Sequence, residues 1–180
     1  MSEDAKTLLV TSRFRVEEIA IVGTQGDTHR RAVVRHPGAV AIIPILSDGR
    51  VCLIRNRRPT IGRTLVEIPA GTRDPGESPE QTALRELHEE TGYRAGRMRA
   101  LCSFYTSPGV LDEEMHLFVA DELTPDQTHL DACEQIENLP VAWEEAIAMI
   151  GSGEVRDAKT IAALLLFDRQ RRASDAAGSR

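Results

Sequence analysis

The stretch from Gly71 to Tyr93 reads GTRDPGESPEQTALRELHEETGY and is the most informative part of this chain. Ser78 is a good helix N-cap, Pro79 suits the first helical position, and Gln81 completes a capping box with Ser78. Gly92 is a natural C-terminal glycine, so one helix is predicted from near Ser78 to near Gly92. Its buried stripe is expected to consist of four residues: Ala83, Leu84, Leu87 and Thr91.

Three glutamates share one side of this predicted helix. Glu86 and Glu90 are four residues apart, and Glu89 follows Glu86 by three, so the carboxylates can face one way. Like charges at that spacing repel, and a purely structural helix gains nothing from them. A divalent cation removes the penalty, and Mg2+ prefers a few carboxylates, waters and substrate phosphates. The alternative is that the glutamates form an ordinary solvated acidic face. This alternative is less favoured, because the glycine loop, Glu77 and Arg85 occur at matching spacing in the same run.

The same run resembles the signature of the Nudix hydrolases, with no polar position missing. This resemblance implies an α/β fold, an α/β/α sandwich with a central mixed sheet beside the signature helix. It also implies a site for Mg2+, for which Mn2+ can substitute. Glu86 and Glu90 would be the principal ligands and the Ala70 carbonyl a third. Glu89 would join with another ion. The resemblance gives structural roles within the signature to Gly71, Glu77, Arg85 and Gly92, and Arg85 would orient the glutamates.

Other segments resemble the ADP-ribose pyrophosphatases of that family. Residues 65–71 lead into the signature, and Pro108 follows its end by fifteen residues, within SPGVLDEEMHLFVA. LIRNRRP (residues 53–59) and VRDAKTIAALLL (residues 155–166) are similar as well. The activity implied is cleavage of ADP-ribose to AMP and ribose 5-phosphate. Two alternatives stay open: a hydrolase of another nucleoside diphosphate sugar, such as a GDP-sugar, and a Nudix module that binds ADP-ribose without cleaving it.

The general base for the attacking water has three candidates. In the ADP-ribose enzymes it can come from a distant loop, and Glu113 and Glu134 lie in suitable regions. We favour Glu113, with Glu89 of the signature helix as the alternative if neither loop residue acts. Arg58 is the preferred contact to phosphate or terminal ribose. The other expected substrate contacts are Glu67, Pro108, Gly109 and Glu113.

The chain is expected to divide into three parts. Residues 1–37 would form a strand and hairpin segment around the turn GTQGD, and the resemblance implies that this segment pairs with a second subunit in a homodimer. Residues 38–172 would be the Nudix domain, and residues 173–180 a disordered tail. Expected strands are 14–22, 30–35, 39–46, 51–55, 64–68, 98–105, 115–120 and 135–142; expected helices besides the signature helix are 143–150 and 157–171, with a loop at 123–134.

Composition restricts the class of protein and its partners. A chain of 180 residues can form one domain with a real core. The net charge of -6 argues against nucleic-acid binding through a basic surface. The three cysteines lack metal spacing, the N-terminus lacks a signal-peptide pattern, and no apolar run approaches a membrane span. We therefore expect a cytoplasmic protein that binds a small nucleoside diphosphate substrate, and neither nucleic acid nor a membrane.

Overall fold

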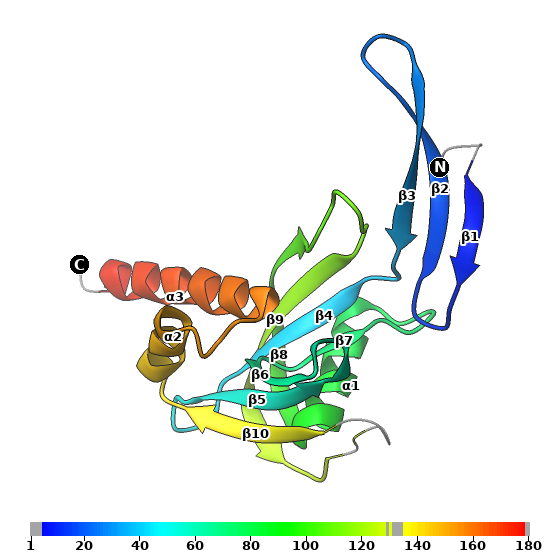
Figure 1. Cartoon of the computed structure of the whole chain (residues 1–180). Coiled ribbons are helices and arrows are strands. Elements are labelled where there is room, and N and C mark those ends of the chain that lie inside the picture. The colour runs from blue at the N-terminus through cyan, green and yellow to red at the C-terminus, as the bar shows by residue number, and fades with distance from the viewer. Residues whose placement is uncertain (1–4, 129, 131–134, 179–180) are drawn as a thin grey trace.

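A mixed sheet of four strands, in the order β7-β4-β9-β8, lies at the centre of the computed structural model (Figure 1). The structure describes residues 5–128, 130 and 135–178. Strands β4 and β9 run parallel, whereas β7 pairs with β4, and β8 with β9, in antiparallel fashion. The four strands are β4 (Ala39–Pro44), β7 (Ala70–Thr72), β8 (Tyr93–Tyr105) and β9 (Glu114–Pro125).

A second sheet, in the order β10-β5-β6, is antiparallel throughout. A short 3-10 helix, η1 (Pro59–Ile61), connects β5 to β6. Arg58 is the last residue of β5 and Glu67 the last residue of β6, so both stand at strand ends. The strands are β5 (Val51–Arg58), β6 (Arg63–Glu67) and β10 (Ile136–Val141).

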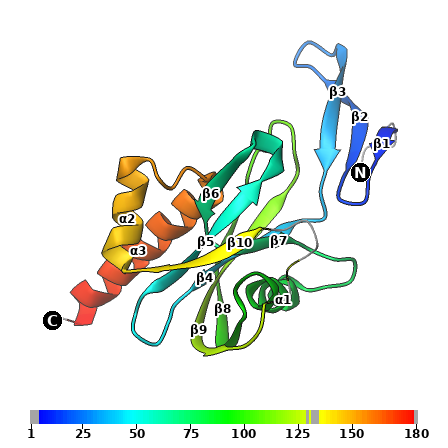
Figure 2. The same ribbon diagram turned by 60° about the horizontal axis from the view of Figure 1, so that its bottom comes forward.

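Helices cover the sheets from two sides, as the views in Figures 1 and 2 show. The helices are α1 (Pro79–Thr91), α2 (Trp143–Ser152) and α3 (Ala158–Gly178). Alternate residues of β4 belong to two different cores: Val40 and Ile42 pack with Leu87 of α1, whereas Ala41 and Ile43 join the larger core with α2 and α3. A strand that is apolar on both faces has to be covered on both faces. The α/β/α sandwich expected from the sequence is therefore confirmed.

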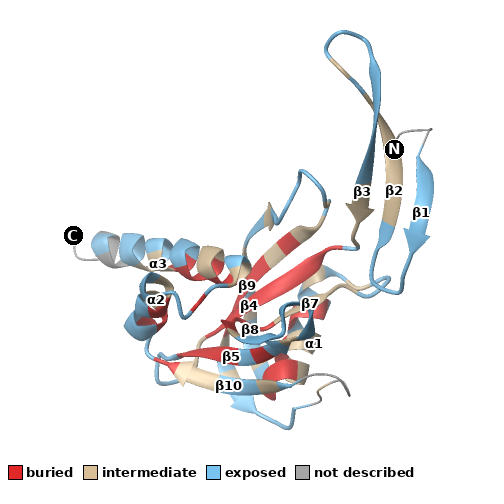
Figure 3. Ribbon diagram, viewed as in Figure 1, coloured by how far each residue is buried: buried red, intermediate tan, exposed pale blue. Residues whose placement is uncertain are grey.

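The N-terminal segment forms a separate three-stranded antiparallel sheet, β1-β2-β3, which projects from the rest of the chain (Figure 1). Strands β2 (Arg15–Val22) and β3 (Thr28–Arg35) form the expected hairpin, and Gly26 takes a positive φ of 83° in its turn. Strand β1 (Lys6–Val10) was not expected. This sheet has no buried residue and is mostly exposed (Figure 3).

Three local expectations differ from the structure. Leu84 is 40% exposed, because Ala83 and Leu87 already occupy the side of α1 that faces the sheet. Strand β9 continues to Pro125, into the segment expected to be a loop from residue 123, because it pairs with β8 as far as Tyr93. Helix α3 continues beyond the expected residue 171 to Gly178. Over the described residues, no helix is both long enough and apolar enough to cross a membrane.

Candidate active site

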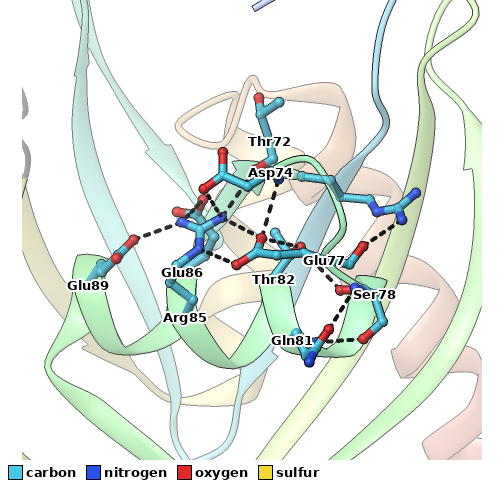
Figure 4. A network of polar contacts seen from close by, with 10 residues as sticks. Thr72, Asp74, Glu77, Ser78, Gln81, Thr82, Arg85, Glu86 and Glu89 are labelled. Carbon is cyan, nitrogen blue, oxygen red and sulfur yellow. Dashed lines mark hydrogen bonds and ion pairs between the residues drawn. The ribbon is translucent and has the colours of Figure 1, made fainter.

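Helix α1 has the ends that the sequence predicted. The Ser78 hydroxyl accepts the backbone N–H of Gln81 at 3.3 Å, and the Gln81 side chain accepts the backbone N–H of Ser78 at 2.9 Å (Figure 4). At the other end, Gly92 has a φ of 70°, and a β-carbon there would lie 2.7 Å from the carbonyl oxygen of Asp126. Only glycine satisfies both conditions, so the end of α1 is fixed as firmly as its start.

Arg85 lies among the glutamates that it was expected to orient (Figure 4). Its guanidinium donates to Glu77 at 3.0 and 3.1 Å, to Glu86 at 2.7 Å and to Glu89 at 2.9 Å. A further N–H reaches the carbonyl oxygen of Thr72 at 3.2 Å. The hydrogen bond from Arg85 lowers the pKa of Glu77 to about 2, and the same bond raises the pKa of Arg85 above its ordinary value. Glu77 and Arg85 are therefore both charged at neutral pH, and Arg85 fixes the direction of two helix carboxylates.

Glu90 is the most buried carboxylate of the helix, with 4% of the residue exposed. Its Oε2 accepts the backbone N–H of Ala70 at 2.9 Å. A buried carboxylate is costly unless it has such partners, and this bond brings it to the backbone of β7. Glu86 meets the same strand, because it stands where a side chain on Gly71 would otherwise lie. Helix α1 and β7 thus present Glu86, Glu90 and the Ala70 backbone together.

This donor set fits a hard cation such as Mg2+. The groups are carboxylates, to which the family resemblance adds the Ala70 carbonyl, and all of these are oxygen ligands. Among the described residues, no three acidic, histidine or cysteine side chains are arranged so that they could hold a metal ion by themselves. Mg2+ is commonly held by one or two carboxylates together with waters and substrate phosphates, so an incomplete cage is the arrangement expected for it. Glu86 and Glu90 would hold the ion together with the Ala70 carbonyl, and Glu89 would join with another ion.

A cleft of about 710 Å³ opens between α1 and the N-terminal sheet. Glu86, Glu89 and Glu90 line it, and so does Ala70. Residues 10–15, at the turn between β1 and β2, line the opposite side. The cleft therefore lies between the signature helix and the turn that connects β1 to β2.

Arg58 lines the cleft, but Glu67 does not. Glu67 is fully buried and accepts two hydrogen bonds from Arg58, at 2.8 Å from Nε and 2.6 Å from Nη2. Lys159 also donates to Glu67. The oxygens of Glu67 are thus used inside the protein, where they hold Arg58, and its contact with substrate stays a prediction.

The loop between β8 and β9 is attached to β3 of the N-terminal sheet. The N–H of Val34 donates to the carbonyl of Val110 at 2.8 Å, and the N–H of Asp112 donates to the carbonyl of Val34 at 3.1 Å. Asp112 also pairs with Arg35 at 3.1 Å and accepts the His36 N–H at 2.8 Å. Asp112 lines the cleft, although the sequence analysis did not single it out. Its place in SPGVLDEE was the available signal.

Three expected residues of this loop are not brought into the cleft. Glu113 accepts the Thr106 hydroxyl at 2.6 Å and lies 3.5 Å from Nδ1 of His36. Pro108 and Gly109 lie in the turn that precedes it, and, like Glu113, they are absent from the described cleft lining. Glu134 lies outside the described residues. Of the three base candidates, the structure places Glu89 at the cleft.

The chain is similar to several known proteins. The family model of the NUDIX domain matches residues 35–164, which contain β7, α1 and Arg85. An ADP-ribose pyrophosphatase of Bacillus subtilis (strain 168) is 43% identical over 151 residues, or 83% of this chain and 80% of that protein. A methanol dehydrogenase activator of Bacillus methanolicus is 39% identical over 160 residues, or 88% and 85% of the two chains. A solved structure of an ADP compounds hydrolase is 25% identical, with a TM-score of 0.81 over 97% of this chain and 95% of that one.

Proposed function

The chain belongs to the family defined by the NUDIX domain, and from that membership we propose that it is an Mg2+-dependent pyrophosphohydrolase that cleaves ADP-ribose to AMP and ribose 5-phosphate. The observation that carries the proposal is the arrangement of Glu86, Glu89 and Glu90 on one side of α1, in a cleft that also contains the Ala70 backbone. A module that only binds ADP-ribose would not need these carboxylates. The B. subtilis relative supports ADP-ribose as the substrate.

The chemistry follows from the charge of the substrate. A diphosphate carries negative charges that repel an attacking water, and a bound Mg2+ would offset them and make a bound water more acidic. Glu86 and Glu90 would hold the ion, while Arg85 keeps Glu86 aimed. Arg58 would donate to a phosphate oxygen. Water adds to one phosphorus as the bridging P–O bond breaks, so that each product leaves with one phosphate.

The attacking water has to lose a proton to a base. Glu89 lines the cleft and so has access to such a water. Glu113 faces Thr106 and His36 instead. The described geometry therefore supports Glu89 over Glu113, and Glu134 stays a prediction from the sequence.

A homodimer is part of the proposal. The N-terminal sheet exposes Leu8, Leu9, Val10 and Val22 and has no buried core of its own. A sheet of three strands needs a hydrophobic face to be stable, and a second copy of the chain could cover these exposed apolar side chains. Light scattering should show twice the monomer mass at micromolar concentration, and a monomer there would count against the dimer.

The described cysteines, Cys52 and Cys102, are unpaired, which is in keeping with a reducing cytoplasm.

The test is a product assay with purified protein and Mg2+. ADP-ribose, GDP-mannose and other nucleoside diphosphate derivatives are supplied separately, and products are separated by chromatography. We expect AMP and ribose 5-phosphate, the highest kcat/KM for ADP-ribose, and no reaction in excess chelator. A higher kcat/KM for a GDP-sugar would move the assignment to that class, and tight ADP-ribose binding without products would make the protein a binding module.

A further inference from the structure

The side chain of Arg58 lines the cleft and is oriented by a buried partner, Glu67. Both oxygens of Glu67 face it, at 2.8 and 2.6 Å, in a bidentate pair. This geometry fixes the plane of the guanidinium as well as its position. The pair uses Nε and Nη2, and the second terminal nitrogen, Nη1, takes no part in it. Because 37% of the Arg58 side chain is exposed and the residue lines the cleft, that nitrogen is available for an anionic substrate group.

Glu67 in turn is held by the first turn of α3. Lys159 donates to its Oε2, and the Lys159 ammonium also lies 3.0 Å from Asp157. Burial opposes ionisation of Glu67, yet the hydrogen bond from Arg58 and the charge of Lys159 outweigh it, so that the pKa of Glu67 lies below its ordinary value. Glu67 is therefore an anion placed between two cations, one in the cleft and one behind it.

A second link ties the same turn of α3 to the strand end. Asp157 accepts the N–H and the hydroxyl of Thr160, at 2.9 and 2.6 Å. The Thr160 hydroxyl oxygen accepts the N–H of Ile68 at 3.0 Å. Asp157 and Thr160 thereby set the position of α3 relative to Ile68, the residue that follows Glu67. The place of Lys159 behind Glu67 is thus fixed by the backbone as well as by charge.

Lys159 affects how much of the Arg58 charge remains for a ligand. If Glu67 faced Arg58 alone, its negative charge would offset the positive charge of the Arg58 guanidinium and attract that guanidinium away from the cleft. Lys159 shares the negative charge of Glu67, so less of the positive charge of Arg58 is offset. Lys159 itself does not line the cleft, and its side chain is only 13% exposed. Any effect of Lys159 on substrate therefore has to pass through Glu67 and Arg58.

We propose that Lys159 is a positioning residue for Arg58, through which α3 contributes to binding the diphosphate of the substrate without touching it. The inference rests on the proposed function only in taking a nucleoside diphosphate derivative as the ligand. It assigns a role to the RDAKT segment, which gives no side chain to the site. Arg58 binds ground state and transition state alike in this role, so loss of Lys159 should raise KM and leave kcat nearly unchanged.

The experiment compares two neutral variants, Lys159→Met and Lys159→Gln, with the conservative Lys159→Arg. Arg156→Met is the matched control, because Arg156 is an exposed cation close to the same turn. We expect KM to rise about tenfold in both neutral variants with kcat within about twofold of wild type. Lys159→Arg should restore most of the affinity, and Arg156→Met should be unchanged. Calorimetry with a methylene-bridged, non-hydrolysable ADP-ribose analogue should show the same order of affinities.

A double-mutant cycle separates positioning from a general structural role. In the Arg58→Gln background, Lys159→Met should raise KM no further, because its only route to the substrate is gone. An equal additional loss in that background would overturn the proposal. So would an unchanged KM in both neutral variants, or unfolding of both, which would make the role of Lys159 structural. If wild type does not hydrolyse ADP-ribose, the proposed substrate fails, and the cycle is run on whichever diphosphate derivative it does hydrolyse.

Discussion

A β-carbon on Gly71 would lie 1.8 Å from Cδ of Glu86 and 1.9 Å from its Oε1. No side chain can approach another so closely, so Glu86 occupies its place only because residue 71 has none. The φ of Gly71 is not positive, and the requirement for glycine is therefore one of space, not of backbone conformation. The position of the Glu86 carboxylate therefore requires glycine at residue 71.

Gly71→Ala should displace the Glu86 carboxylate from the strand. We expect kcat/KM to fall at least about a hundredfold, since the displaced group is a proposed metal ligand, and stability to fall by about 1–3 kcal/mol through overpacking. Steady-state kinetics and thermal unfolding measure the two effects. Gly151→Ala is the control, because a β-carbon there meets no atom within 4 Å. Wild-type turnover in Gly71→Ala would contradict the steric argument.

Glu86→Gln and Glu90→Gln should each remove a charged ligand while keeping the side-chain shape. We expect kcat to fall at least about a hundredfold in each, with the fold intact by circular dichroism, since each ligand supports the charge stabilisation supplied by the ion. Glu80→Gln, on the exposed first turn of α1, is the control and should keep wild-type kcat. Near-wild-type turnover in Glu90→Gln at saturating Mg2+ would show that the metal site is assigned wrongly.

The general base can be identified by comparing Glu89→Gln, Glu113→Gln and Glu134→Gln. Loss of a base lowers kcat and kcat/KM together, whereas loss of a binding residue raises KM. We expect Glu89→Gln to lose turnover, because Glu89 lines the cleft, and Glu113→Gln to change KM at most. Rates from about pH 6 to 9.5 should show whether the remaining pH dependence has lost one ionisation. If only Glu134→Gln loses turnover, the base comes from the loop instead.

Glu77 should make stability depend on pH in the acid range. Its pKa falls from an ordinary 4.5 to about 2 in the fold, chiefly through the hydrogen bond from Arg85. Because the folded value is the lower one, the stabilisation is fully present above about pH 4.5 and is lost as the pH falls toward 2. The difference in Tm between wild type and Glu77→Gln should therefore be largest near neutral pH and shrink on acidification. Glu80→Gln is the control. A Tm difference between wild type and Glu77→Gln that stays constant down to pH 2 would contradict the link between the Glu77 pKa and stability.

The sequence predicted α1 closely because everything that defines the helix is local. Ser78, Gln81 and Gly92 fix its ends within a few residues of chain, and the spacing of Glu86 and Glu90 follows from helical geometry alone. The β2–β3 hairpin was predictable for the same reason, since its turn residues are adjacent in sequence. Local signals of this kind do not depend on how the rest of the chain folds.

The features that were missed depend on distant contacts. Lys159 meets Glu67 across 92 residues of sequence, and no local pattern marks such a pair. Asp112 reaches Arg35 across 77 residues. Strand β1 is a different case: it pairs with the next strand, β2, and was missed because its own segment is short and exposed. Residues that face one another only after the sheets have formed cannot be recognised from spacing along the chain.

The guanidinium of Arg85 joins Glu77, Glu86 and Glu89 to the carbonyl oxygen of Thr72, and so connects the helix to the strand and loop that precede it. The conformational freedom of that loop is therefore removed when the chain folds, before any substrate arrives. Ordering flexible groups at the moment of binding would subtract from affinity. A diphosphate that enters the cleft meets carboxylates already held in place, and more of its interaction energy remains for binding and for the transition state.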